Sequence, residues 1–320
     1  WDERYAYRFT SAQIDTLEQA TIELHQMCLE AVDHIIRNGQ IEHFAIPRAF
    51  WSEVEDSWKE REFSLYGRFD LSWNGSGHPK MLEYNADTPT GIVESSVAQW
   101  YWLQDVHPHA DQFNSLHEKL IEQWKKLNTK GVLHFVCADS EEDIGNLSYL
   151  RDTAIQAGYA TKQCLISSLG WDEANAELVD DQDVKIDNLF KLYPWEWMAH
   201  ETFGPHMRTS ELPVLEPAWK VLMSSKANLP VLWELNPGHP NLLPCFYDAA
   251  QAPAQTAAST PAAGGLSAIV GALAGGATAN VPSPQQSPAA TPPGPSASNP
   301  TTAFREAASV IANAEAGILS

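Results

Sequence analysis

The chain has few cysteines, few basic residues and no long apolar run. Its four cysteines, Cys28, Cys137, Cys164 and Cys245, are widely spaced, so neither a C-x-x-C redox motif nor a zinc-finger pattern is present. Cys28 and Cys137 lie in apolar surroundings, which is typical of small core residues. Lys and Arg number 20 against 41 Asp and Glu, and the net charge of −21 argues against nonspecific nucleic-acid binding. With no signal-peptide pattern and no apolar segment of about 18 residues, we expect a cytoplasmic protein without a membrane partner.

The composition of the chain changes abruptly near residue 249. Residues 1–248 contain all 12 tryptophans, whereas residues 249–320 are rich in Ala, Pro, Ser, Gly and Thr and contain only three charged residues. A segment of the second kind cannot bury enough apolar surface to fold. We therefore expect a folded domain over 1–248, large enough for a sizeable core, followed by a low-complexity, mostly disordered tail over 249–320.

Alternating helix and strand patterns predict an α/β architecture. Apolar residues at helical spacing predict helices over 11–38, 49–60, 92–103, 110–128, 141–157 and 215–223, and a further one starting at Pro230. Apolar runs predict strands over 131–137, 160–166 and 187–193. We expect Ser11 to cap the first helix, and Phe113 to lie on the apolar side of the fourth.

The most informative segment runs from Ser64 to Gly91. It contains two alternating runs joined by Asn74-Gly75-Ser76-Gly77, and Asn-Gly between such runs is a strong hairpin signal. A turn centred near Gly77 predicts four facing pairs: Arg68 with Asn85, Phe69 with Tyr84, Asp70 with Glu83, and Leu71 with Leu82. Because side chains alternate along a strand, we expect one apolar face and one face with two carboxylates, an amide and a guanidinium.

Two facing carboxylates destabilise a sheet unless something compensates for their repulsion. Asp70, Glu83 and the amide oxygen of Asn85 are hard ligands of the kind that Mg²⁺ binds, with waters and substrate phosphates completing its coordination. Arg68 beside them could hold a phosphate bidentately. The pattern therefore favours phosphoryl transfer or nucleotide-dependent ligation. The alternative is a solvated hairpin face on which Arg68 simply neutralises Asp70.

Several linked motifs together resemble one known family. They are Tyr66-Gly-Arg-Phe-Asp-Leu71, Leu82-Glu-Tyr-Asn-Ala-Asp-Thr-Pro-Thr90, Phe113-Asn-Ser-Leu-His-Glu-Lys-Leu120, Asn188-Leu-Phe-Lys-Leu-Tyr-Pro-Trp-Glu-Trp197, Glu216-Pro-Ala-Trp219, Ser225-Lys-Ala-Asn-Leu-Pro-Val-Leu-Trp-Glu-Leu235 and Pro240-Asn-Leu-Leu-Pro244. Over about residues 1–248 the chain resembles the glutathionylspermidine synthase family, specifically its stand-alone acid–amine ligase branch. The resemblance implies a pre-ATP-grasp domain followed by part of an ATP-grasp fold.

The resemblance also implies an ATP-dependent carbon–nitrogen ligase. In the enzyme that names the family, ATP phosphorylates the glycine carboxylate of glutathione, and spermidine attacks the acyl phosphate to give an amide, ADP and phosphate. By resemblance, Asp70, Glu83 and Asn85 are Mg²⁺ ligands, Arg68 contacts phosphate, and Lys226 is the first ATP-binding lysine. The expected partners are ATP, Mg²⁺, a peptide-like acid such as glutathione, and a polyamine-like amine, with which the negative charge of the chain is compatible.

Four further residues match substrate positions of that family. Thr88 and Thr90 stand where the named enzyme has serines near its acid substrate, and their hydroxyls can still donate hydrogen bonds. Glu141 and Glu142 match an acidic pair associated with the amine. The alternative interpretation of that pair is favourable charge at a helix N-terminus.

The chain departs from the family pattern beyond Pro244. A second lysine strand of the type Val-Val-Lys-Pro and a glycine-rich loop of the type Ser-Arg-Glu-Gly-Ala-Asn are not found in residues 249–320. Because one lysine cannot replace that phosphate cradle, we expect this chain by itself to be a poor or inactive ligase, with a tail that derives from a shifted reading frame or a fragment. The alternative is a non-catalytic module, or pseudoenzyme, that binds metal or ligand.

Two other enzyme classes are disfavoured by the sequence. A phosphatase or nuclease that uses the carboxylate pair would need further His or Asp metal ligands, and no such cluster accompanies the pair. An amidase would need a cysteine nucleophile with a partnered histidine, and none of the four cysteines lies in a recognisable motif of that kind.

Overall fold

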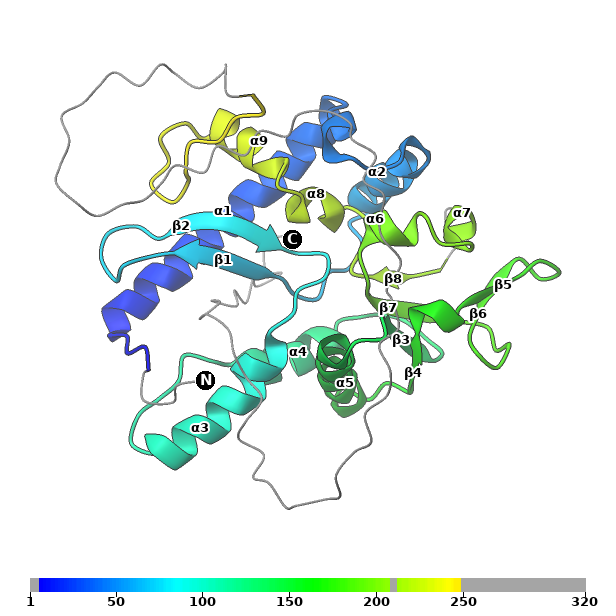
Figure 1. Ribbon diagram of the computed structural model, residues 1–320, viewed down its shortest axis with the longest axis horizontal. Helices are drawn as coiled ribbons and strands as arrows, with labels where there is room; N and C mark the ends of the chain where they lie inside the picture. Colours follow the sequence, from blue (N-terminus) through cyan, green and yellow to red (C-terminus); the bar gives the residue numbers. More distant parts are fainter. Residues whose placement is uncertain (1–5, 208–211, 249–320) are drawn as a thin grey trace, which may run out of the picture.

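A computed structural model describes residues 6–207 and 212–248 of the protein, arranged as in Figure 1. The helices are α1 (Ser11–Arg37), α2 (Trp51–Lys59), α3 (Gln99–Val106), α4 (Leu116–Trp124), α5 (Glu141–Gln156), α6 (Trp195–Met198), α7 (Gly204–Met207), α8 (Lys220–Ser224) and α9 (Asn228–Leu235). Short 3-10 helices occupy Ile41–Phe44, Arg48–Phe50 and Ile166–Ser168, and a π-helix occupies Glu94–Ala98. The strands are β1 (Arg68–Ser72), β2 (Lys80–Asn85), β3 (Leu133–Cys137), β4 (Thr161–Leu165), β5 (Gly170–Asp172), β6 (Glu177–Val179), β7 (Asn188–Leu192) and β8 (Val214–Leu215). The tail expected over 249–320 lies outside the described residues.

A four-stranded parallel sheet has the strand order β4-β3-β7-β8. β3 and β7 are buried at every position, as expected for inner strands of a parallel sheet that is covered on both faces. α5 packs on β3 and β4, and α4 packs on α5; the two helices lie together beside the sheet in Figure 1. The predicted α/β architecture is confirmed.

The two faces of this sheet belong to different apolar clusters. On one face, Trp124 packs against Phe135 and Phe190, with ring centroids 5.8 Å apart in both pairs. On the other face, Val136 and Leu189 belong to a cluster that includes the buried side of α1 and of the β1–β2 hairpin. The sheet is therefore the layer that joins the α4–α5 side of the protein to the hairpin side.

The residue that caps the long helix α1 lies one position earlier than predicted. Its cap is Thr10 rather than Ser11: the Gln13 N–H donates to Thr10 Oγ1 at 3.3 Å, and the Gln13 side chain accepts the Thr10 N–H at 2.8 Å, which is a capping box. Cys28 on α1 and Cys137 on β3 are fully buried, which confirms their predicted place in the core. Within the described ranges, no helix is long and apolar enough to cross a membrane.

Two predicted helices are shorter than their sequence pattern indicated. The helix expected over 110–128 is α4, and Phe113 precedes it with 51% of its surface exposed, so its predicted apolar packing is wrong. Asn114 explains the late start, because its Oδ1 accepts the N–H of Leu116 at 3.0 Å in place of helical backbone bonding. The helix expected from residue 215 begins later, as α8, because β8 takes up its first residue. The very short strands β5, β6 and β8 were not predicted.

The β1–β2 hairpin has three of the four predicted pairs. The confirmed pairs are Arg68 with Asn85, Phe69 with Tyr84, and Asp70 with Glu83. The fourth prediction is wrong, because a β-bulge sets Leu71 opposite Met81 and leaves Leu82 45% exposed. A bulge places one extra residue on one strand, so Met81 rather than Leu82 completes the apolar face.

Tyr84 lies at the centre of the buried face of the hairpin. Its ring stacks on Phe69 with centroids 3.8 Å apart, and a Cβ at Gly67 would lie 2.6 Å from Tyr84 Cε2, so a larger residue would displace the ring. The Tyr84 hydroxyl is 3.0 Å from Nδ1 of His25 on α1. Burial, assisted by the charge of Lys220, lowers the pKa of His25 to about 4.

His25 should make the protein less stable in mild acid. The unfolded chain protonates this histidine near its ordinary pKa of 6.5 while the folded protein keeps it neutral down to about pH 4, so stability falls as the pH decreases between these values. From about pH 7 to about pH 5 the loss due to His25 is about 2 kcal/mol. Urea unfolding at both pH values should show that H25Q removes this part of the pH dependence, whereas H34Q on the same helix does not. An unchanged pH dependence in H25Q would contradict the account.

Candidate metal and phosphate site

The hairpin brings together the four polar residues predicted to share one of its faces. The Arg68 guanidinium binds the Asp70 carboxylate through two hydrogen bonds, Nε to Oδ1 at 2.9 Å and Nη2 to Oδ2 at 3.3 Å. On the neighbouring strand, Asn85 Nδ2 donates to Glu83 Oε1 at 3.1 Å. All four side chains are half-buried, so the backbone fixes them while solvent can still reach them.

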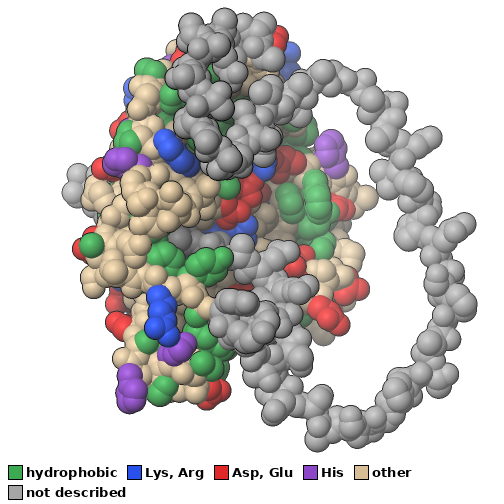
Figure 2. Space-filling model, turned by 60° about the vertical axis from the view of Figure 1, so that its left-hand side comes forward, with side chains coloured by type: hydrophobic (Ala, Val, Ile, Leu, Met, Phe, Trp, Pro, Cys, Tyr) green, Lys and Arg blue, Asp and Glu red, His purple; other side chains and the backbone are tan. Residues whose placement is uncertain are grey.

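Lys226 joins this group from a distant part of the chain. It lies in the turn between α8 and α9, and its ammonium donates a hydrogen bond to the Glu83 carboxylate. This bond, together with the one from Asn85, holds the pKa of Glu83 below its usual range. Asp70 and Glu83 therefore each bind one cation, which compensates for the repulsion expected between facing carboxylates. Figure 2 shows acidic and basic side chains side by side in the middle of one face of the molecule, with hydrophobic side chains nearby.

The donor set of the hairpin suits Mg²⁺. The carboxylates of Asp70 and Glu83 and the amide oxygen of Asn85 are hard ligands, and a Mg²⁺ ion held by so few protein groups keeps waters or takes phosphate oxygens. In the part of the chain that the structure describes, no group of three or more His, Cys, Asp and Glu side chains is gathered as metal ligands. The hairpin set is of a smaller kind, with two carboxylates and one amide.

The segment that follows β2 is tied to the same site. Arg68 Nη1 donates to the Thr90 carbonyl at 3.1 Å and to Thr90 Oγ1 at 3.3 Å, and the Tyr66 hydroxyl donates to the Pro89 carbonyl at 2.6 Å. Thr88 is half-buried in this segment. The structure thus brings Thr90 into contact with the hairpin cluster and places Thr88 two residues before it.

Glu141 and Glu142 are exposed in the first turn of α5. Ser140 caps this helix, and acidic residues at that position are favourable to the helix dipole. Among the described residues, no hydrogen bond or ion pair joins either carboxylate to the hairpin. The backbone near Glu142 is linked to Ile92 through one side chain of α5. Asn146 accepts the N–H of Ile92 at 3.1 Å and donates to the Glu142 carbonyl at 2.9 Å. The pair therefore adjoins the end of the segment after β2 without belonging to the cluster.

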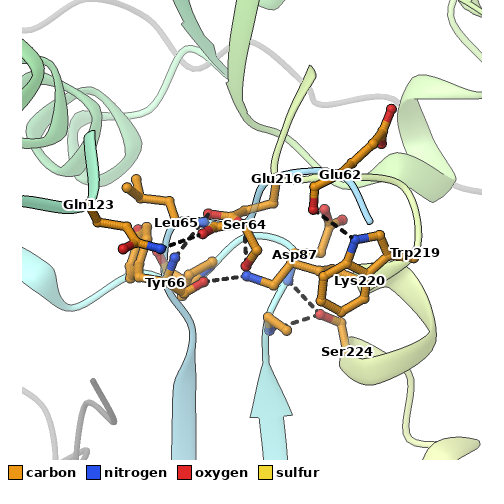
Figure 3. Close-up of polar contacts among 12 residues, drawn as sticks. Glu62, Ser64, Leu65, Tyr66, Asp87, Gln123, Glu216, Trp219, Lys220 and Ser224 are labelled. Atoms are coloured by element: carbon orange, nitrogen blue, oxygen red, sulfur yellow. Dashed lines mark hydrogen bonds and ion pairs between the residues drawn. The ribbon is translucent and has the colours of Figure 1, made fainter. Parts of the chain in front are cut away.

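A buried ion pair, Glu216 with Lys220, holds the chain just before β1 (Figure 3). Glu216 accepts the N–H groups of Leu65 at 3.1 Å and Tyr66 at 3.2 Å. Lys220 Nζ lies 2.7 Å from Glu216 Oε2 and donates to the Tyr66 carbonyl at 2.5 Å. Both side chains are essentially inaccessible to solvent, and three of the bonds named here end on the backbone that enters the hairpin.

A second buried ion pair, Asp87 with Lys191, holds the chain just after β2. Asp87 Oδ1 lies 2.5 Å from Lys191 Nζ, and Asp87 Oδ2 accepts the N–H of Trp195 at 3.0 Å. Ser224 Oγ accepts the N–H groups of Ala86 at 2.9 Å and Asp87 at 2.7 Å, and these two bonds are drawn in Figure 3. Side chains of other elements therefore bind the backbone that leaves the hairpin as well as the backbone that enters it.

Neither buried pair was predicted from the sequence. A signal existed for Lys191, which is the charged residue of the apolar strand β7, because a charge in a buried strand requires a partner. Glu216 and Lys220 are four residues apart and follow β8. Their local pattern is that of an ordinary surface pair, which hides their burial.

Comparison with known proteins supports the resemblance that the motifs indicated. Residues 1–265 match the family described as "Glutathionylspermidine synthase preATP-grasp". The chain belongs to this family. It is 41% identical over 254 residues to a "Putative acid--amine ligase" of Haemophilus influenzae, an alignment that covers 77% of this chain and 64% of that protein. The predicted membership in the glutathionylspermidine synthase family is confirmed.

More distant relatives also carry synthetase names. Trypanothione synthetase of Crithidia fasciculata is 25% identical over 254 residues, which cover 71% of this chain and 39% of that protein. The bifunctional glutathionylspermidine synthetase/amidase of Escherichia coli is 27% identical over 271 residues, which cover 76% of this chain and 43% of that protein. The chain thus spans less than two thirds of the length of each of these three relatives.

Proposed function

We propose that the residues of this chain serve an ATP- and Mg²⁺-dependent ligase that joins a carboxylate to an amine. The observation that carries the proposal is the facing pair of Asp70 and Glu83, with Arg68 bonded to the first carboxylate and Lys226 to the second. Such ion pairs can be exchanged for a divalent metal and phosphate oxygens. Membership in a family of ligases and synthetases supports the same reaction class.

Different side chains of the site would bind the metal and the phosphate. Asp70, Glu83 and Asn85 would hold Mg²⁺, which when bound neutralises charge on the transferring phosphate. Arg68 presents a rigid fork that suits two phosphate oxygens, and Lys226 presents a compact charge on a flexible stem. Because Lys226 is 68% exposed, it can turn from Glu83 toward a nucleotide without any change in the backbone.

Other residues near these groups would bind the two substrates. Thr88 and Thr90 would hold the acid, so that its carboxylate oxygen lies beside Arg68 and attacks the γ-phosphorus of ATP, releasing ADP. The neutral amine nitrogen then attacks the acyl carbon, the bond from that carbon to the phosphate oxygen breaks, and the proton lost from nitrogen leaves with phosphate. Glu141 and Glu142 would attract a polyamine-like amine, as would the net negative charge of the chain.

Mn²⁺ binding tests the proposed metal ligands. We expect wild-type protein to bind Mn²⁺ at a single site, and D70N to weaken this binding by about tenfold or more, because one of two charged ligands is lost. A titration followed by the electron paramagnetic resonance signal of free Mn²⁺ measures both affinities. D152N, which removes an exposed carboxylate on α5, is the matched control and should bind as wild type does. Equal affinities of D70N and wild type would exclude the hairpin as the metal site.

ADP release from MgATP in the presence of glutathione and spermidine tests the reaction. Residues 249–320 contain no second lysine strand or glycine-rich loop, so we expect release by the 320-residue chain to be slow. We also expect it to require both the acid and the amine and to be lost in D70N. Robust Mg²⁺-dependent release would contradict the expected impairment. Release that D70N leaves unchanged would contradict the ligase assignment.

A further inference from the structure

The segment 86–90 determines where two groups of the proposed site are placed. It directly follows the proposed metal ligand Asn85 and contains Thr88, which is proposed to hold the acid. Its first two N–H groups donate to Ser224 Oγ at 2.9 and 2.7 Å, and its last carbonyl accepts from Arg68 at 3.1 Å. A shift of this segment would therefore move an amide ligand of the metal and a hydroxyl of the acid site together.

Asp87 is the charged residue of this segment, and its side chain is buried in the protein. It is 3% exposed, and its partner Lys191 is fully buried. The carboxylate binds Lys191 Nζ at 2.5 Å and the Trp195 N–H at 3.0 Å, and the Lys191 ammonium lies 4.9 Å from the centre of the Trp195 ring, within cation–π range. One side chain thus joins the end of β2 to both β7 and α6.

Stability by itself is a poor reason to bury such a pair. Two charges taken out of water seldom stabilise a fold more than well-packed apolar side chains of similar volume would. A carboxylate bound on both oxygens does, however, fix a backbone in one place, whereas apolar contacts permit sliding. Asp87 and Lys191 are both buried away from the half-exposed side chains of the site, and the segment is the chain that joins Asp87 to Asn85 and Thr88.

We propose that Asp87 and Lys191 are positioning residues, whose buried bond sets the segment 86–90, and with it Asn85 and Thr88, at the place from which they face the metal and the acid. The proposal rests on the proposed function, which identifies the site as one for a metal ion and an acid substrate. Its physical claim concerns the backbone of 86–90, which can be measured without any activity.

The test separates position from stability. K191M alone leaves Asp87 buried without its cation, so we expect a lower melting temperature. D87L/K191M replaces the pair with two apolar side chains and should regain most of that loss. In this double variant we expect the backbone N–H groups of 86–90 to exchange about tenfold faster in hydrogen–deuterium exchange mass spectrometry, the change expected for the loss of one net hydrogen bond. We also expect the double variant to bind Mn²⁺ more weakly than wild type.

The matched control removes the same charges elsewhere. E177L/K185M deletes a pair on the β5–β6 hairpin and its flank, and it should leave both exchange at 86–90 and Mn²⁺ binding at wild-type values. Wild-type exchange in D87L/K191M would overturn the proposal and leave the pair a role in stability alone. If that variant does not fold, D87N, which keeps an acceptor for the Trp195 N–H, replaces it with the same expected direction. If wild-type protein binds no Mn²⁺, the proposed function fails, while the exchange comparison still decides the positioning claim.

Discussion

Two buried ion pairs bind the backbone at the two ends of the β1–β2 hairpin. Glu216 with Lys220 holds the backbone that enters β1, and Asp87 with Lys191 holds the backbone that leaves β2. A two-stranded hairpin is at best marginally stable by itself, so the rest of the protein must fix its two ends. One ammonium group comes from α8, which packs on β2 and α1, and the other comes from β7 of the parallel sheet. The polar face of the hairpin is thereby set relative to that sheet.

The ion pairs of the protein differ in how easily they can be exchanged. Removing one partner of a buried pair costs about 3–5 kcal/mol, because the other charge is left uncompensated. An exposed pair such as Lys226 with Glu83, in which the lysine is 68% exposed, contributes about 0–1 kcal/mol. The buried pairs therefore persist under conditions in which Lys226 can leave Glu83 for another anion. A rigid support with exchangeable cations is what binding of a metal and a nucleotide phosphate requires.

Local pattern predicts the hairpin better than it predicts what surrounds it. Alternation together with a turn centred near Gly77 places Asp70 opposite Glu83, because the side-chain period of a strand is fixed and the turn sets the register. It misses the bulge, since the Met81 N–H donates to the carbonyl of Asn241 at 2.9 Å and thus bonds to a segment far along the chain. It also misses Asp87, whose partner is 104 residues away. The roles of the site residues remain predictions from resemblance and ligand chemistry.

Anomalous X-ray scattering from Mn²⁺-soaked crystals tests most directly whether the anchored hairpin is a divalent-metal site. We predict one anomalous peak in coordination contact with the carboxylates of Asp70 and Glu83 and the amide oxygen of Asn85. We further predict that Lys226 has moved away from Glu83 while the bond between Asp87 and Lys191 is unchanged. Mn²⁺ bound only at other residues, with Lys226 still bonded to Glu83, would contradict the account.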